Sequence, residues 1–70
     1  MKTYLVTLKP APNDHKIGRA QLSATLDKMG ISHNIKEFWY FGRHRAVIEM
    51  HPSSAKKVES SGLAESVCFA

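Results

Sequence analysis

Residues 32–50 read SHNIKEFWYFGRHRAVIEM, and this stretch decides the fold. Residues 32–41 are rich in aromatic and β-branched side chains, which predicts an extended strand. Residues 45–50, RAVIEM, predict a second strand. The pair Gly42-Arg43 lies between them, and a two-residue loop that begins with glycine favours a type II′ turn. We therefore expect a β-hairpin at the centre of the chain.

Working outward from the hairpin, a helix is expected on each side. Residues 14–29 place apolar side chains at helical spacing, and Gly30 provides the stop. After the hairpin, Pro52 opens a short helix that Gly62 closes.

The two ends of the chain complete the pattern. Residues 3–9 and 63–69 predict a first and a last strand, which gives the order β-α-β-β-α-β. Two right-handed βαβ halves joined through a hairpin resemble the ferredoxin-like superfamily. We expect an α+β sandwich, with four antiparallel strands and both helices on one face of the sheet, formed by residues 1–70 as a single domain.

The assumed turn determines which side chains reach the face of the sheet without helices. It directs Trp39 and Phe41 toward the core, and it directs Phe38 and Tyr40 outward. It also points Glu37 inward. A shift of one residue in the pairing of the two strands would exchange the faces on which the two aromatic pairs lie. The expected cross-strand pairs are Phe41 with His44, Tyr40 with Arg45, Trp39 with Ala46, Phe38 with Val47, and Lys36 with Glu49.

Aromatic side chains beside cations are typical of binding platforms, so the partner-binding site is expected here. A loop, a terminus or a second copy of the chain covering the face is the alternative. A second basic patch is expected around the entrance of the first helix, although each basic cluster is also consistent with solvated side chains. The expected partner-binding residues are Lys36, Phe38, Tyr40, Arg43, His44, Arg45 and Val47, and the second patch is Lys9, Lys16 and Arg19.

Composition limits the classes of partner. Ten Lys and Arg against six Asp and Glu give a net charge of +4, which favours a nucleic acid, an acidic protein surface or an anionic membrane. No apolar run is long enough to span a membrane, and the N-terminus reads as a strand rather than a signal peptide. The only cysteine, Cys68, is expected in the core, and the lack of an intramolecular disulfide favours the cytoplasm.

The sequence does not suggest an enzyme or a cofactor. The histidines fall in different predicted elements, and His44 and His51 lie on opposite faces of one strand, so no metal site is expected. No phosphate-binding loop, nucleophile elbow or paired carboxylates are apparent.

Two family resemblances bear on function. Residues 3–8, TYLVTL, and residues 43–50, RHRAVIEM, are similar to the first- and third-strand motifs of RNA-recognition motifs. In that family, aromatic side chains on these strands stack on bases. The resemblance implies that Tyr4 is a stacking residue and that single-stranded RNA is the partner. Arg45, Val47 and Met50 replace the aromatic residues of the third strand.

Residues 4–9, YLVTLK, also resemble the opening strand of subtilisin-type propeptide inhibitors, and residues 42–50, Ala55 and Val67 follow the later pattern of that family. The resemblance implies a sheet that lies against a protease and a C-terminal tail inserted into its active site. The chain ends at Ala70, directly after the last predicted strand, and its basic charge differs from the usual acidity of that family.

Small non-enzymatic domains of this size are also common among phage and mobile-element proteins that block a host enzyme or defence complex. The favoured expectation is therefore an inhibitor or regulator that binds a protein or nucleoprotein complex. RNA binding and protease inhibition are the alternatives, and a homodimer through the open sheet face or the edge of the last strand remains open.

Overall fold

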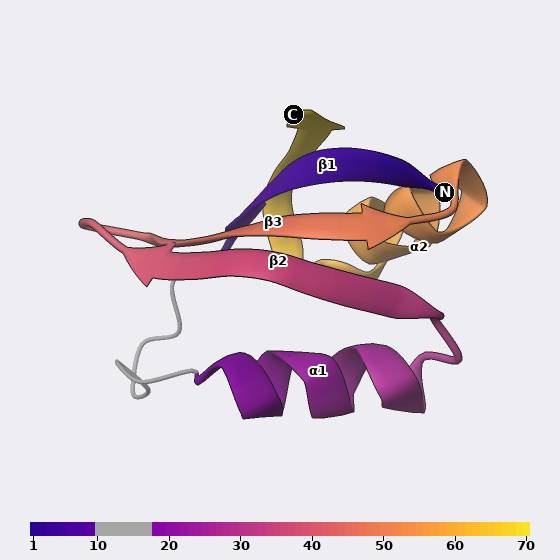
Figure 1. Ribbon diagram of the computed structural model, residues 1–70, viewed down its shortest axis with the longest axis horizontal. Coiled ribbons are helices and arrows are strands. Elements are labelled where there is room, and N and C mark those ends of the chain that lie inside the picture. Colours follow the sequence, from indigo (N-terminus) through magenta and orange to yellow (C-terminus); the bar gives the residue numbers. More distant parts are fainter. Residues whose placement is uncertain (10–17) are drawn as a thin grey trace.

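The computed structural model describes residues 1–9 and 18–70 and shows a four-stranded sheet with two helices (Figure 1). The strands lie in the order β2-β3-β1-β4, and all neighbours are antiparallel. This arrangement confirms the predicted α+β, ferredoxin-like βαββαβ fold. The elements are β1 (Lys2–Leu8), α1 (Arg19–Lys28), β2 (His33–Tyr40), β3 (His44–Met50), α2 (Pro52–Ser61) and β4 (Ala64–Phe69).

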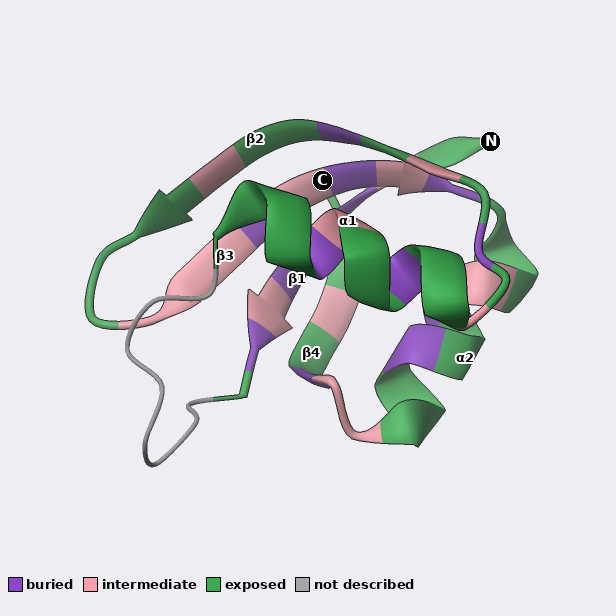
Figure 2. Ribbon diagram, turned by 90° about the horizontal axis from the view of Figure 1, so that it is seen from below, coloured by how far each residue is buried: buried purple, intermediate pink, exposed green. Residues whose placement is uncertain are grey.

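Both helices pack on the same face of the sheet, as the view from the helix side shows (Figure 2). Every second residue of β1 and β3 is buried beneath them, because side chains alternate between the two faces of a strand. The buried apolar residues of the core are Tyr4, Val6, Leu8, Leu22, Leu26, Ile31, Ile35, Ala46, Ile48, Met50, Ala55, Val58 and Ala64.

The helix boundaries agree in part with the sequence prediction. In the described residues the first helix begins at Arg19, with Gly18 as its N-cap in an extended conformation. Residues 14–17 lie outside the described residues. The second helix begins at Pro52 as predicted, and Gly62 ends it in the left-handed conformation, with φ +84°, that favours glycine.

The register of the hairpin differs from the prediction. Tyr40 pairs with His44, so the loop has three residues, with Gly42 at its centre at φ +71°. A bulge between Ile35 and Glu37 shifts the register again. The predicted two-residue turn and the backbone register derived from it are therefore wrong, although the expected Lys36–Glu49 side-chain pair does form.

The energetic reason for this register lies in β2. The two-residue turn would have pointed a carboxylate toward the core. The three-residue loop places Glu37 opposite Val47 on the solvent side, and the bulge then keeps Ile35 in the core, opposite Ile48. An unpaired carboxylate buried in an apolar core costs several kcal/mol, and the three-residue loop avoids that cost.

The shift exchanges the two aromatic pairs. Trp39 lies opposite Arg45, on the side without helices, whereas Phe38 lies opposite Ala46, whose side chain is buried in the core. The expectation that Phe38 and Tyr40 point away from the helices, and that Trp39 points toward the core, is therefore wrong.

Neither helix in the described part of the chain is long and apolar enough to cross a membrane.

Candidate binding surface

The face of the sheet opposite the helices, here called the open face, has a small apolar centre. Leu5 of β1 pairs with Val47 of β3 there, and both side chains are half-buried. The neighbouring pairs on the same two strands are Thr7 with Arg45 and Thr3 with Glu49. The β1 and β3 residues of the open face are Thr3, Leu5, Thr7, Arg45, Val47 and Glu49, and all are half-exposed.

Trp39 of β2 extends the open face toward the hairpin. It lies directly opposite Arg45 across the strands, and 37% of the residue is exposed. Directly paired residues have Cβ atoms about 4.5–5.5 Å apart, close enough for an indole ring and an arginine side chain to touch. Trp and Arg are both enriched among the residues that dominate binding energies at protein interfaces.

The charges around the open face are balanced. Lys36 Nζ lies 3.7 Å from the carboxylate of Glu49, and Arg43 donates a hydrogen bond to the carboxylate of Glu65 in β4. The side chain of Glu65 is about half-exposed, as is that of Lys36. The face and its border carry three cations, Lys36, Arg43 and Arg45, and three carboxylates, Glu37, Glu49 and Glu65.

The predicted basic cluster at the hairpin tip does not form as a single patch. Arg43 is paired with Glu65, and Arg45 belongs to the open face. His44 lies on the helix side of the hairpin, where its ring centroid is 4.6 Å from that of Tyr40 and 5.7 Å from that of Phe38. The hairpin end therefore carries aromatic side chains on both of its faces.

Two aromatic residues of the hairpin that the two-residue turn would direct toward the core are exposed. These are Trp39, on the open face, and Phe41, in the loop, which is 82% exposed. The sequence signal that could have located them is Glu37, whose inward position in the two-residue-turn register is unfavourable.

The second predicted basic patch is not assembled by the residues that the structure describes. Arg19 donates a hydrogen bond to the carbonyl oxygen of Ile35 in β2, at one edge of the sheet. The backbone of Lys9 binds the carbonyl of Leu63, which leads into β4 at the opposite edge. Lys16 lies outside the described residues.

Cys68 is exposed and does not lie in the core as predicted. It pairs with Leu5 across the strands, which places it on the open face of an edge strand. Among residues 1–9 and 18–70, no three His, Cys, Asp or Glu side chains come close enough together to hold a metal ion.

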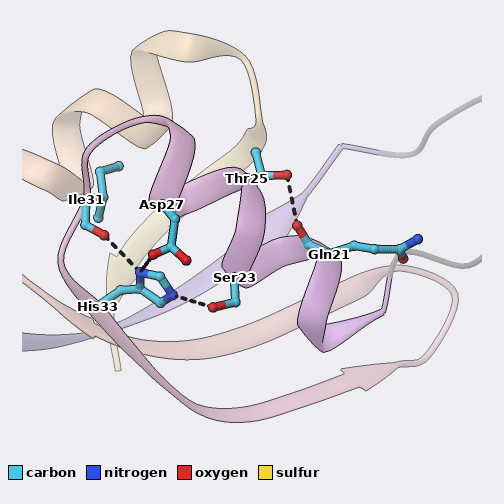
Figure 3. A network of polar contacts seen from close by, with 6 residues as sticks. All are labelled: Gln21, Ser23, Thr25, Asp27, Ile31 and His33. Carbon is cyan, nitrogen blue, oxygen red and sulfur yellow. Dashed lines mark hydrogen bonds and ion pairs between the residues drawn. The ribbon is translucent and has the colours of Figure 1, made fainter.

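A histidine network connects α1 with β2, away from the open face (Figure 3). His33 Nδ1 lies 2.9 Å from the carbonyl oxygen of Ile31, and Nε2 lies 2.9 Å from the Ser23 hydroxyl. Because a carbonyl only accepts, Nδ1 of His33 donates to the Ile31 oxygen, and Nε2 is the ring nitrogen that contacts the Ser23 hydroxyl. The carboxylate of Asp27, 3.8 Å from Nδ1, is mostly exposed. The network ties the helix to the strand.

Ser23→Ala is expected to lower the free energy of unfolding by about 1 kcal/mol, because it removes the partner of a nearly buried imidazole nitrogen. Urea denaturation followed by circular dichroism measures the change. Thr25→Ala removes an exposed hydroxyl from the same helix and is the matched control, with an expected change below about 0.5 kcal/mol. Equal effects of the two substitutions would contradict a structural role for the Ser23–His33 contact.

Comparisons of the chain with protein-family models, with curated proteins and with solved structures found no match.

Proposed function

We propose that this chain is a small non-enzymatic binding protein that inhibits or regulates a larger protein or nucleoprotein complex through its open face. The observation that carries this proposal is the combination of an apolar centre at Leu5 and Val47 with the exposed Trp39–Arg45 pair. A partly apolar surface with an aromatic and an arginine anchor, surrounded by charged residues, has the composition of a protein interface.

The orientation of Tyr4 supports a protein partner over single-stranded RNA. Resemblance to an RNA-recognition motif would require this ring on the open face. Instead only 5% of Tyr4 is exposed, and it stacks on Phe69 on the side of the sheet that packs against the helices. On the open face, β1 presents Thr3, Leu5 and Thr7, which have no ring for a base to stack on.

The charge balance of the open face supports the same choice. Affinity for nucleic acids depends mainly on cations that neutralise phosphates. Here Lys36 and Arg43 each have a carboxylate partner, which leaves a face without a net positive charge. Paired charges of this kind suit the polar rim of a protein–protein contact.

Protein capture tests the proposal. The chain is immobilised and exposed to lysate from the cells that encode it, with and without nuclease treatment, alongside the variants Val47→Glu and Ala24→Glu. Val47→Glu places a carboxylate at the centre of the open face, whereas Ala24→Glu makes the same chemical change on an exposed position of α1. We expect a protein that the unmodified chain and Ala24→Glu retain and that Val47→Glu loses by at least about 10-fold, since an unpaired charge at an interface centre costs several kcal/mol.

Two outcomes would contradict the proposal. In one, Val47→Glu captures the same proteins in the same amounts as the unmodified chain. In the other, every captured protein disappears when nucleic acid is digested. Circular dichroism of both variants establishes that a lost interaction is not a lost fold.

A subtilisin-type protease is a specific partner to test, because the resemblance to propeptide inhibitors implies a contact through the sheet. Residues of that resemblance, including Ala46, Ile48, Ala55 and Val67, lie in the core or pack against it, which supports a shared fold rather than a shared activity. Hydrolysis of a chromogenic peptide by subtilisin, measured with and without the chain, tests this candidate directly. Inhibition that Val47→Glu abolishes would support it, and unchanged hydrolysis at micromolar chain would remove it.

A further inference from the structure

The positive charge of the molecule is segregated from the open face. Outside that face and its border, the described residues carry six cations against two carboxylates, so the net charge of +4 of the described residues lies there. The open face itself is balanced. The six cations are Lys2, Lys9, Arg19, Lys28, Lys56 and Lys57, and the two carboxylates are Asp27 and Glu59.

Four of these cations belong to the two helices, and two of them, Lys28 and Lys57, lie where the helices approach each other. Lys57 Nζ donates to the carbonyl oxygen of Met29, at a distance of 2.6 Å. This contact brings Lys57 beside the C-terminal end of α1, which carries Lys28, where the two helices approach each other (Figure 2). Lys56 instead lines a groove on the other flank of α2, together with Tyr4 and Phe69. The basic helix layer is defined here as the exposed residues Arg19, Lys28, Lys56 and Lys57.

The other exposed residues of the helices limit what this layer can bind. The large apolar side chains that are exposed in the described residues all lie outside α1 and α2. The two helices therefore carry no large apolar side chain to insert into a lipid bilayer and no ring on which an unpaired base could stack. One exposed ring, that of Phe69, borders the layer in the groove that Lys56 lines. The layer offers hydroxyl and amide groups beside the lysines, and these are the groups that bind phosphate oxygens. The exposed ones are Gln21, Thr25, Ser53, Ser60 and Ser61.

We propose that the basic helix layer binds the phosphate backbone of a double-stranded nucleic acid without reading its sequence. This inference goes beyond the proposed function and does not depend on it, since it uses the opposite side of the molecule. The two surfaces together would let one small domain contact both the protein and the nucleic-acid part of a nucleoprotein complex.

Fluorescence anisotropy with a labelled duplex of random sequence tests the inference, using the purified chain without any protein partner. The affinity is expected to fall steeply between about 50 and about 200 mM salt, because bound counterions are released from the phosphates. A single-stranded oligonucleotide of the same length is expected to bind more weakly, because α1 and α2 carry no exposed rings.

A charge-matched pair of variants locates the binding surface. Lys28→Glu with Lys56→Glu changes the helix layer and leaves Lys57 in its contact with Met29, whereas Lys36→Glu with Arg45→Glu makes the same change in net charge beside and on the open face. We expect the helix-layer variant to lose at least about 10-fold in affinity and about 2 units of the log–log salt slope. The open-face variant should lose much less.

The inference is overturned if the chain shows no duplex binding at low salt, or if the two double variants lose affinity equally. It is also overturned if phosphatidylserine vesicles bind the chain and the duplex does not. Protein capture through the open face is measured without nucleic acid, so failure of one proposal leaves the other to be judged separately.

Discussion

Ile48→Ala is expected to lower the free energy of unfolding by about 2–5 kcal/mol. Ile48 has no exposed surface and lies in the central part of the sheet, opposite Tyr4 on one side and Ile35 on the other. Truncation leaves a cavity that the close-packed core cannot fill. A chain of this length has only about 4–10 kcal/mol of total stability, so a large part of it would be lost.

Urea denaturation monitored by circular dichroism measures this change, with Ile48→Val as the control. The smaller substitution removes one methyl group and is expected to cost about 0.5–1.5 kcal/mol. A loss below about 1 kcal/mol for Ile48→Ala would mean that this position is not in the core, and that the strand faces are assigned wrongly.

Trp39→Ala is expected to weaken binding to the protein partner by about 30-fold, which corresponds to about 2 kcal/mol and is typical of a central aromatic anchor. Tyr40→Ala is the matched control. Its ring is adjacent in sequence and 62% exposed, but it lies beside His44 on the opposite face of the hairpin. Its removal is expected to change the affinity by less than about 3-fold. Isothermal titration calorimetry with the captured protein measures both values.

A loss of affinity in Tyr40→Ala but not in Trp39→Ala would contradict binding through the open face. If Tyr40→Ala abolished binding and Trp39→Ala did not, the contact would lie on the helix side of the hairpin, beside His44 and Phe38. Phe38 and Tyr40 are also the two aromatic side chains that the two-residue turn would have placed on the open face. The pair of variants therefore tests the hairpin register and the proposed surface together.

The element order could be predicted from sequence because each element has its own local signals. Pro52 and Gly62 mark the ends of α2, and alternation marks β1 and β3. The hairpin register could not be predicted in the same way, because it depends on loop length and on a bulge near Lys36. Neither leaves a distinct local pattern, since Gly42 suits a two-residue and a three-residue loop equally well.

The candidate surface depends on that register, so a wrong register assigns the wrong side chains to the open face. A shift of one residue moves every side chain of the strand end to the other face, so Trp39 and Tyr40 exchange roles. Cys68 shows a related limit, because an apolar final strand does not reveal which of its two faces is covered. The separation of the net positive charge from the open face could not be predicted from the sequence either, because Arg43 and Glu65 are 22 residues apart and pair only in the folded chain.

The central claim is that the open face is the protein-binding surface. Heteronuclear NMR of the isotope-labelled chain, titrated with the captured protein, tests it most directly. The account predicts chemical-shift changes and line broadening centred on Leu5, Trp39, Arg45 and Val47, with α1 and α2 little affected. Changes centred on the helices, with these four residues unperturbed, would contradict it.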